Sequence, residues 1–129
     1  MTAPLHILLI SGEYPPLPGG VGDYTRCLAA ALRDESARVS VLTTDEVPAG
    51  SENIYPVMPG WGFRHWPRLQ RFIDELQPDW VHWQYQTAAF AMSPAVNLWP
   101  LRQRRKRDRP RIAVTFHDLR VPYLFPKAG

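Results

Sequence analysis

The chain has 129 residues, about the length of one domain, and its 45% hydrophobic and 21% charged side chains are ordinary for a globular protein. It contains neither a run of about 18 apolar residues, as a membrane span needs, nor the basic and apolar segments of a signal peptide. Cys27 is the single cysteine, so an internal disulfide is excluded. We expect Cys27 to be a small buried residue on a helix, and a reducing cytoplasmic location fits this composition.

The net charge of +3 hides an uneven distribution of charge. Seven of the 15 Lys and Arg residues lie in 102–111, and the rest of the chain carries eight basic against eleven acidic side chains. This basic run has three readings: cations that complement a helix C-terminus, a surface that docks on an anionic membrane, or a contact with nucleic-acid phosphates. No aromatic residue interleaves with the arginines, which disfavours nucleic acid as a partner.

The first predicted elements are a strand, a glycine-rich loop and a helix. Residues 5–10 are apolar apart from His6, as expected for a strand that is covered on both faces. The loop 11–20 contains three prolines and three glycines and is therefore irregular. A helix follows over 21–34. Its predicted apolar stripe consists of Val21, Tyr24, Leu28, Ala31 and Leu32.

Two strands and a second helix come next. Residues 38–43 predict a second strand, and 54–58 predict a short third strand that Pro56 interrupts. The spacing of apolar residues predicts a helix over 64–76. Its apolar face is expected to consist of Leu69, Phe72, Ile73 and Leu76.

The last predicted elements are a strand over 80–84, a helical run over 88–107 that Pro94 and Pro100 break or bend, and a strand over 111–116. Strands that alternate with helices indicate βαβ units and hence a parallel sheet with helices on its faces. The fold class is therefore α/β, a Rossmann-like parallel sheet flanked by helices. In such folds ligands bind beyond the carboxyl ends of the strands.

Three features of the sequence follow the ends of predicted strands. They are the glycine-rich loop after the first strand, Gln84-Tyr85-Gln86 after the fourth, and His117-Asp118 after the fifth. The loop matches neither the P-loop pattern nor Gly-x-Gly-x-x-Gly, because Asp23-Tyr24-Thr25 follows Gly22. A strand that ends in glycines and leads into a helix N-terminus is an anion site, although a plain tight turn explains the glycines too.

Three segments together resemble the N-terminal domain of retaining GT-B glycosyltransferases of family 4. The first is Gly-Glu-Tyr-Pro-Pro-Leu-Pro-Gly-Gly-Val-Gly-Asp-Tyr-Thr from Gly12, followed by Leu-Ala-Ala-Ala-Leu. The second is Pro-Asp-Trp-Val-His-Trp-Gln over 78–84, and the third is Val-Thr-Phe-His-Asp-Leu over 114–119. They occur in the family's order, and the resemblance covers nearly the whole chain.

The resemblance implies roles for five residues. Gly19, Gly20 and Gly22 would approach the diphosphate of a nucleotide-sugar, which is the donor substrate. His117 would face the donor sugar as a catalytic residue, and Asp118 would hold the histidine or its loop. The structural alternative for His117 is a ring satisfied by a backbone carbonyl. The four histidines lack metal-ligand spacing, so we expect no metal and no protein-bound cofactor.

Further loop residues are candidates for binding an acceptor, which would be a glycan, a lipid or a small molecule. They are Glu13, Tyr14, Gln84, Tyr85 and Gln86. Residues of these types also cap helices and line loops where no ligand binds. The aromatic group Trp61, Phe63 and Trp66 is either an acceptor platform or loop packing against the sheet edge.

The resemblance implies that residues 1–129 form one half of a two-domain enzyme, without the C-terminal domain that binds most of the donor. We therefore expect a truncated, cytoplasmic piece that is inactive alone, with peripheral membrane contact through 102–111 as one option. Two other classes stay open. One is a standalone flavodoxin-like domain that binds a phosphate or nucleotide, and the other is a module that docks on a membrane or partner through 102–111.

Overall fold

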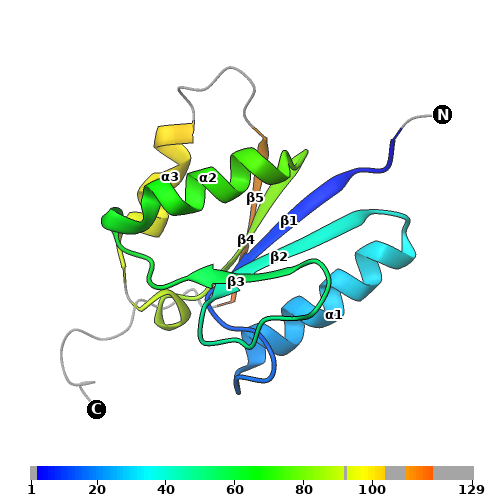
Figure 1. Ribbon diagram of the computed structural model, residues 1–129, viewed down its shortest axis with the longest axis horizontal. Helices are drawn as coiled ribbons and strands as arrows, with labels where there is room; N and C mark the ends of the chain where they lie inside the picture. The colour runs from blue at the N-terminus through cyan, green and yellow to red at the C-terminus, as the bar shows by residue number, and fades with distance from the viewer. Residues whose placement is uncertain (1–2, 92, 104–109, 118–129) are drawn as a thin grey trace, which may run out of the picture.

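The computed structural model describes residues 3–91, 93–103 and 110–117. Its strands form one five-stranded parallel sheet in the order β3-β2-β1-β4-β5, with α1 on one face and α2 and α3 on the other (Figure 1). In chain order the elements are β1 (His6–Ser11), α1 (Gly20–Asp34), β2 (Arg38–Thr44), β3 (Ile54–Met58), η1 (Phe63–His65), α2 (Trp66–Leu76), β4 (Trp80–Tyr85), η2 (Ala88–Phe90), α3 (Ala95–Gln103) and β5 (Arg111–Phe116), where η1 and η2 are 3₁₀ helices. The predicted α/β class, parallel sheet and flanking helices are therefore confirmed.

Small residues bring α1 close to its face of the sheet. Val21, Thr25 and Ala29 recur every four residues and are buried, so they form the contact stripe. The predicted stripe was partly wrong, because Tyr24 is 45% exposed and Ala31 is exposed. The packed positions are those whose side chains allow a close approach. The apolar cluster below them consists of Leu9, Tyr14, Ala29, Val39, Val41 and Val47.

The larger core cluster fills the opposite face, under α2 and α3. Leu69 and Ile73 of α2 are buried as predicted, and Phe72 and Leu76 pack against the same cluster. Aromatic side chains pack against one another in this cluster. The Trp83 ring lies 5.5 Å from that of Trp99 and 5.7 Å from that of Phe90, measured between ring centroids.

The helical run predicted over 88–107, with breaks or bends at Pro94 and Pro100, is interrupted around Pro94 in the structure. The chain forms η2, turns at Ala91 with a left-handed φ of 53°, and starts α3 at Ala95. The Ser93 hydroxyl accepts the Ala95 N–H at 3.3 Å, which supplies a new helix start. Pro100 lies within α3, and residues 104–109 of the basic run lie outside the described residues.

Cys27 is exposed, so its predicted burial was wrong. It lies two residues from both Thr25 and Ala29, which are buried. Two residues correspond to about 200° around a helix, so Cys27 faces away from the sheet.

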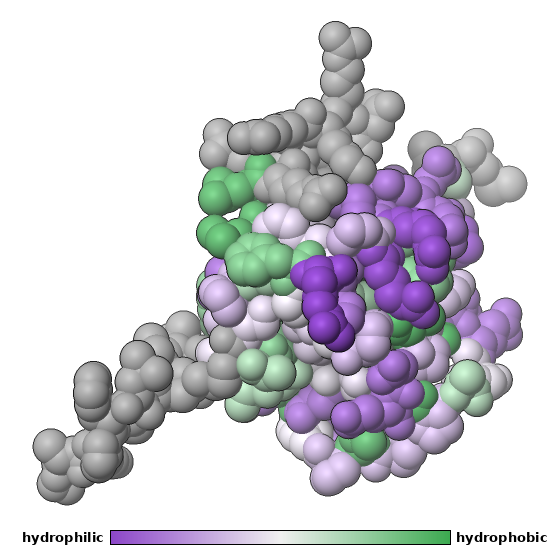
Figure 2. All heavy atoms as spheres, turned by 60° about the vertical axis from the view of Figure 1, so that its left-hand side comes forward, coloured by the Kyte–Doolittle hydropathy of each residue, from purple (hydrophilic) through white to green (hydrophobic). Residues whose placement is uncertain are grey.

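Polar and apolar side chains share the outer surface. Figure 2 shows hydrophilic atoms over much of the face that carries α2 and α3, with hydrophobic atoms exposed beside them. Leu98 and Leu101 of α3 and Phe116 of β5 are among the exposed large hydrophobic side chains. Among the described residues, no helix combines the length and apolarity that crossing a membrane requires.

The sheet order places a topological switch between β1 and β4. The chain leaves β1 towards β2 on one side and later returns to place β4 on the other side. Ser11, the last residue of β1, pairs in register with Gln84 of β4. In open parallel sheets ligands bind in the crevice at this point, outside the carboxyl ends of the strands.

Candidate functional site

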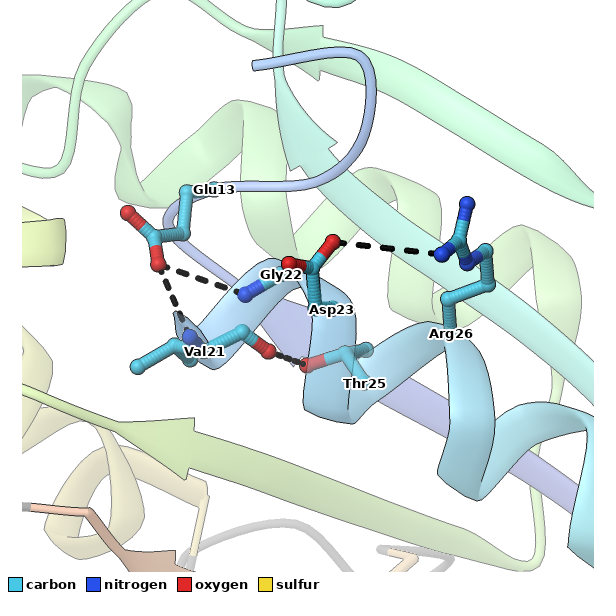
Figure 3. Close-up of polar contacts among 6 residues, drawn as sticks. All are labelled: Glu13, Val21, Gly22, Asp23, Thr25 and Arg26. Carbon is cyan, nitrogen blue, oxygen red and sulfur yellow. Dashed lines mark hydrogen bonds and ion pairs between the residues drawn. The ribbon is translucent and has the colours of Figure 1, made fainter. Parts of the chain in front are cut away.

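The carboxylate of Glu13 caps the N-terminus of α1. Its Oε1 accepts the N–H groups of Val21 at 3.0 Å and of Gly22 at 3.2 Å (Figure 3). The cap residue Gly19 has no side chain that could do this. A helix N-terminus presents unpaired N–H groups and a partial positive charge, which a carboxylate stabilises. The anion site predicted at this loop therefore holds a carboxylate of the chain itself.

The three predicted phosphate-binding glycines have different surroundings. Gly19 has a φ of +153°, which L-residues rarely adopt, and a Cβ there would displace the Glu13 carboxylate from its capping position. A Cβ on Gly22 would lie 3.0 Å from the Tyr14 Cα. Gly20 is exposed, with nothing within 4 Å of such a Cβ. Gly20 is thus the position of the three where the loop is open to a ligand.

The remaining contacts in Figure 3 support the first turns of α1. The Thr25 hydroxyl donates to the Val21 carbonyl at 2.7 Å and keeps a polar side chain satisfied where it is buried. Asp23 and Arg26 lie 4.0 Å apart, and both side chains are more than half exposed. An ion pair of this kind contributes little to stability.

His117 lies directly beyond β5 and is held on two sides. Its backbone N–H donates to the Tyr85 carbonyl at 2.9 Å, which extends the ladder between β4 and β5. Its ring Nε2 lies 3.0 Å from the Gln84 Oε1. The Tyr24 ring packs edge-on against the imidazole at 4.8 Å between centroids. Among the described residues, the hydrogen-bond partner of the ring is thus a side chain, not the backbone carbonyl of the structural alternative.

Burial makes His117 a neutral imidazole near neutral pH. Loss of solvent lowers its pKa below 6.5, and the nearby Glu13 carboxylate opposes this only in part. His82 lies on the same face two residues before Gln84, with its Nε2 2.7 Å from the Thr115 hydroxyl. Burial, and to a lesser extent His117, lowers the pKa of His82 as well. The site thus contains two imidazole rings, His82 and His117, whose pKa values are lowered. The Glu13 carboxylate lies near the second of them.

The predicted acceptor-binding residues separate into two groups. Glu13 and Gln84 lie on the α1 side with His117, although Gln84 is fully buried. Tyr14 is buried in the core, and its pKa is raised by that burial. The Tyr85 ring packs on the opposite face against Phe90 and Phe116.

Gln86 is half-buried, and its backbone carbonyl accepts the N–H of Phe90 at 3.4 Å. Asp118 lies outside the described residues. Tyr24 was missed as a site residue, because its helical spacing with apolar residues placed it in the stripe. The signal that could have identified Tyr24 as a site residue was its position one helical turn after Gly20.

The aromatic group around Gly60 and Gly62 does not form one surface. Trp61 is buried, with its ring 4.8 Å from that of Phe90. Phe63 is half exposed and lies edge-on to Trp66 at 4.9 Å. Trp61 therefore packs into the core, and Phe63 is the most exposed member of the group. Across 3–91, 93–103 and 110–117, no group of three or more His, Cys, Asp or Glu residues is arranged to hold a metal ion.

Comparison with models of protein families matches residues 18–128 to the family described as Glycosyltransferase Family 4. The matched range contains the three glycines and His117, whereas Glu13 precedes it. Searches of curated proteins and of solved structures give no significant match.

Proposed function

Because the chain belongs to glycosyltransferase family 4, we propose that it forms the acceptor-side half of a retaining glycosyltransferase that uses a nucleotide-sugar donor. A glycosyltransferase-like role follows from the family itself. The observation that carries the finer proposal is that Glu13 caps α1, which begins at Gly20, and lies near His117 beyond the end of β5. The exposed Gly20, the Glu13 carboxylate and the neutral His117 ring lie beyond the carboxyl ends of the strands, where parallel sheets bind ligands.

The proposed reaction separates charge in a way that this edge of the sheet can stabilise. Positive charge develops on the sugar as its bond to the diphosphate breaks, and negative charge develops on the leaving diphosphate. The N-terminus of α1 offers the diphosphate the part of its positive charge that the Glu13 carboxylate does not neutralise. Since Glu13 holds the N–H groups of Val21 and Gly22, the diphosphate approaches along the open side at Gly20.

His117 acts in this proposal as an uncharged hydrogen-bonding group towards the donor sugar. Its lowered pKa keeps the imidazole neutral, so it orients hydroxyl groups and adds no positive charge beside the developing cation. Glu13 supplies the negative charge on this side of the site. Its carboxylate lies near His117 and favours a cationic sugar electrostatically.

The acceptor and the setting of the enzyme belong to the same proposal. A glycan, a lipid or a small molecule would approach from the side of Glu13 and Gln86. The enzyme would act in the cytoplasm, with the basic run 102–111 in peripheral contact with an anionic membrane. The nucleotide-sugar is consumed as a substrate, and the reaction needs no cofactor bound by this chain.

A binding experiment on the chain tests the proposal directly. Saturation-transfer NMR with a panel of uridine, guanosine and adenosine diphosphate sugars should detect contact to the sugar and the diphosphate. Gly20→Val and His117→Ala should each weaken that binding. Gly62→Ala is the matched control, because Gly62 also has open space around it and lies outside the cluster of Gly20, Glu13 and His117.

The outcomes separate the candidate functions. Sugar-dependent binding that requires Gly20 and His117 supports the glycosyltransferase. Equal binding of inorganic phosphate and nucleotide-sugars, insensitive to His117→Ala, would contradict it and favour a general phosphate-binding domain. Binding to anionic vesicles with no response to any nucleotide would favour a docking module.

A further inference from the structure

Gln84 occupies an unusual position for a residue of a ligand site. It lies in the middle of the sheet, in register with Ser11 of β1 and Thr115 of β5, and it is fully buried. A side chain enclosed in this way does not reach a ligand. Its Oε1 nevertheless lies 3.0 Å from the Nε2 of His117, which is the more exposed partner. The contact therefore joins the buried Gln84 amide to the partly exposed His117 ring.

The chemistry of the amide determines which ring nitrogen carries the proton. A carbonyl oxygen accepts hydrogen bonds and donates none. The contact of the Gln84 Oε1 with the His117 Nε2 is a hydrogen bond only when Nε2 carries the hydrogen. In a neutral imidazole the lone pair then lies on Nδ1.

Stability alone gives a weak reason for a glutamine at this position. Its Nε2 is buried and lacks a hydrogen-bond partner among the described residues. A buried donor without a partner is unfavourable, and an apolar side chain of similar size would avoid that cost. What an apolar side chain could not do is accept a hydrogen bond from His117.

We infer that Gln84 is a positioning residue that holds the His117 ring in place and fixes its proton on Nε2, so that Nδ1 is the acceptor presented to a ligand. The consequence for catalysis rests on the proposed function, in which His117 orients the donor sugar. With its proton fixed on Nε2, the ring accepts a hydrogen bond from a sugar hydroxyl through Nδ1. The edge-on contact with Tyr24 restricts the ring from another side.

Histidine NMR of the chain tests this inference without any substrate. In the wild-type protein at pH 7.5, long-range proton–nitrogen correlations of His117 should show Nε2 protonated and Nδ1 unprotonated. Gln84→Met should turn this pattern into that of a mixture of tautomers, with the chain still folded. Gln84→Glu, which keeps an acceptor oxygen, should restore protonated Nε2 and raise the His117 pKa.

Thr115→Val is the matched control. It removes the hydroxyl partner of His82 in the same pair of strands, and it should alter the His82 signals while leaving the tautomer of His117 unchanged. A wild-type ring protonated on Nδ1 would overturn the inference. An unchanged His117 tautomer in Gln84→Met would also overturn it. The same holds if Thr115→Val disturbs the His117 signals as much as Gln84→Met does.

The NMR measurement remains decisive if Gln84→Met fails to fold. The wild-type spectrum and that of Gln84→Glu each test whether Nε2 of His117 carries the proton. The measurement also separates this inference from the proposed function. Absence of nucleotide-sugar binding would remove the catalytic consequence and leave the tautomer result standing. A wrong tautomer together with sugar binding would remove the role of Gln84 and leave the glycosyltransferase proposal intact.

Discussion

Replacing Glu13 with alanine should measurably destabilise the fold, although Glu13 belongs to neither core cluster. The change removes two hydrogen bonds to the Val21 and Gly22 N–H groups and one negative charge from the positive end of α1. Loss of a helix cap costs about 1 kcal/mol, and the charge at a helix end contributes about 0.5 kcal/mol. Glu13 is half-buried, so solvent weakens the charge term, and we expect a total of about 1 kcal/mol.

For a domain of this size, that loss lowers the melting temperature by about 4 °C. Glu13→Gln keeps an acceptor oxygen without the charge and should lose about half as much. The difference between wild type and Glu13→Gln should shrink in about 1 M salt, because only the charge term is screened.

Thermal unfolding followed by circular dichroism measures these differences. Glu75→Ala is the matched control. It removes an exposed carboxylate of α2 that lies 3.9 Å from Arg71 of the same helix. Its melting temperature should stay within about 1 °C of wild type. If Glu13→Ala melts with wild type, or the Glu75 control falls equally, the capping argument is refuted.

Three further predictions concern Gly19 in the same loop, the histidines whose pKa values burial lowers, and Cys27 on α1. Gly19→Ala should cost about 1 to 3 kcal/mol in urea unfolding, because alanine rarely adopts a φ of +153° and its Cβ would meet the Glu13 carboxylate; an unchanged midpoint would contradict this. The histidines with pKa values lowered by burial are His6, His82 and His117. The unfolded chain binds protons at these rings near pH 6.5 whereas the native state does so only at lower pH, so the free energy of unfolding should fall as the pH falls below about 6.5. A flat melting temperature from pH 7.5 to 5 would count against those shifts. Cys27 is exposed, so the native protein should react with a thiol reagent as completely as the unfolded protein does; protection without denaturant would contradict its placement.

The sequence predicted the elements well because the strands and α2 carry strong apolar patterns. Residues 38–43 and 111–116 are rich in β-branched and apolar side chains, and both segments are strands in the structure. The stripe on α1 was harder to predict, because hydrophobicity placed Tyr24 inside whereas packing selected the smaller Thr25 and Ala29. Periodicity identifies which residues can be buried, and the distance between helix and sheet decides which of them are.

The position of the site was predictable, and its internal contacts were not. Parallel topology brings the ends of β1, β4 and β5 to one edge, so His117 and Gln84 were expected to lie close together. The capping of α1 by Glu13 joins residues eight and nine positions apart across a proline-rich loop. No pattern of spacing indicates that a carboxylate will turn back in this way. The glycines therefore indicated a ligand, and for Gly19 the structure shows an internal partner.

The exposed side of β5 has a practical consequence for work with this chain. β5 pairs with β4 along one side, and among the described residues no strand covers its other side. Its backbone groups there are not paired with any described strand, so an extended segment of another molecule can pair with them, and Phe116, 60% exposed, makes such a contact more favourable. Concentrated samples should therefore self-associate edge to edge, and light scattering over a dilution series would reveal this before binding data are interpreted.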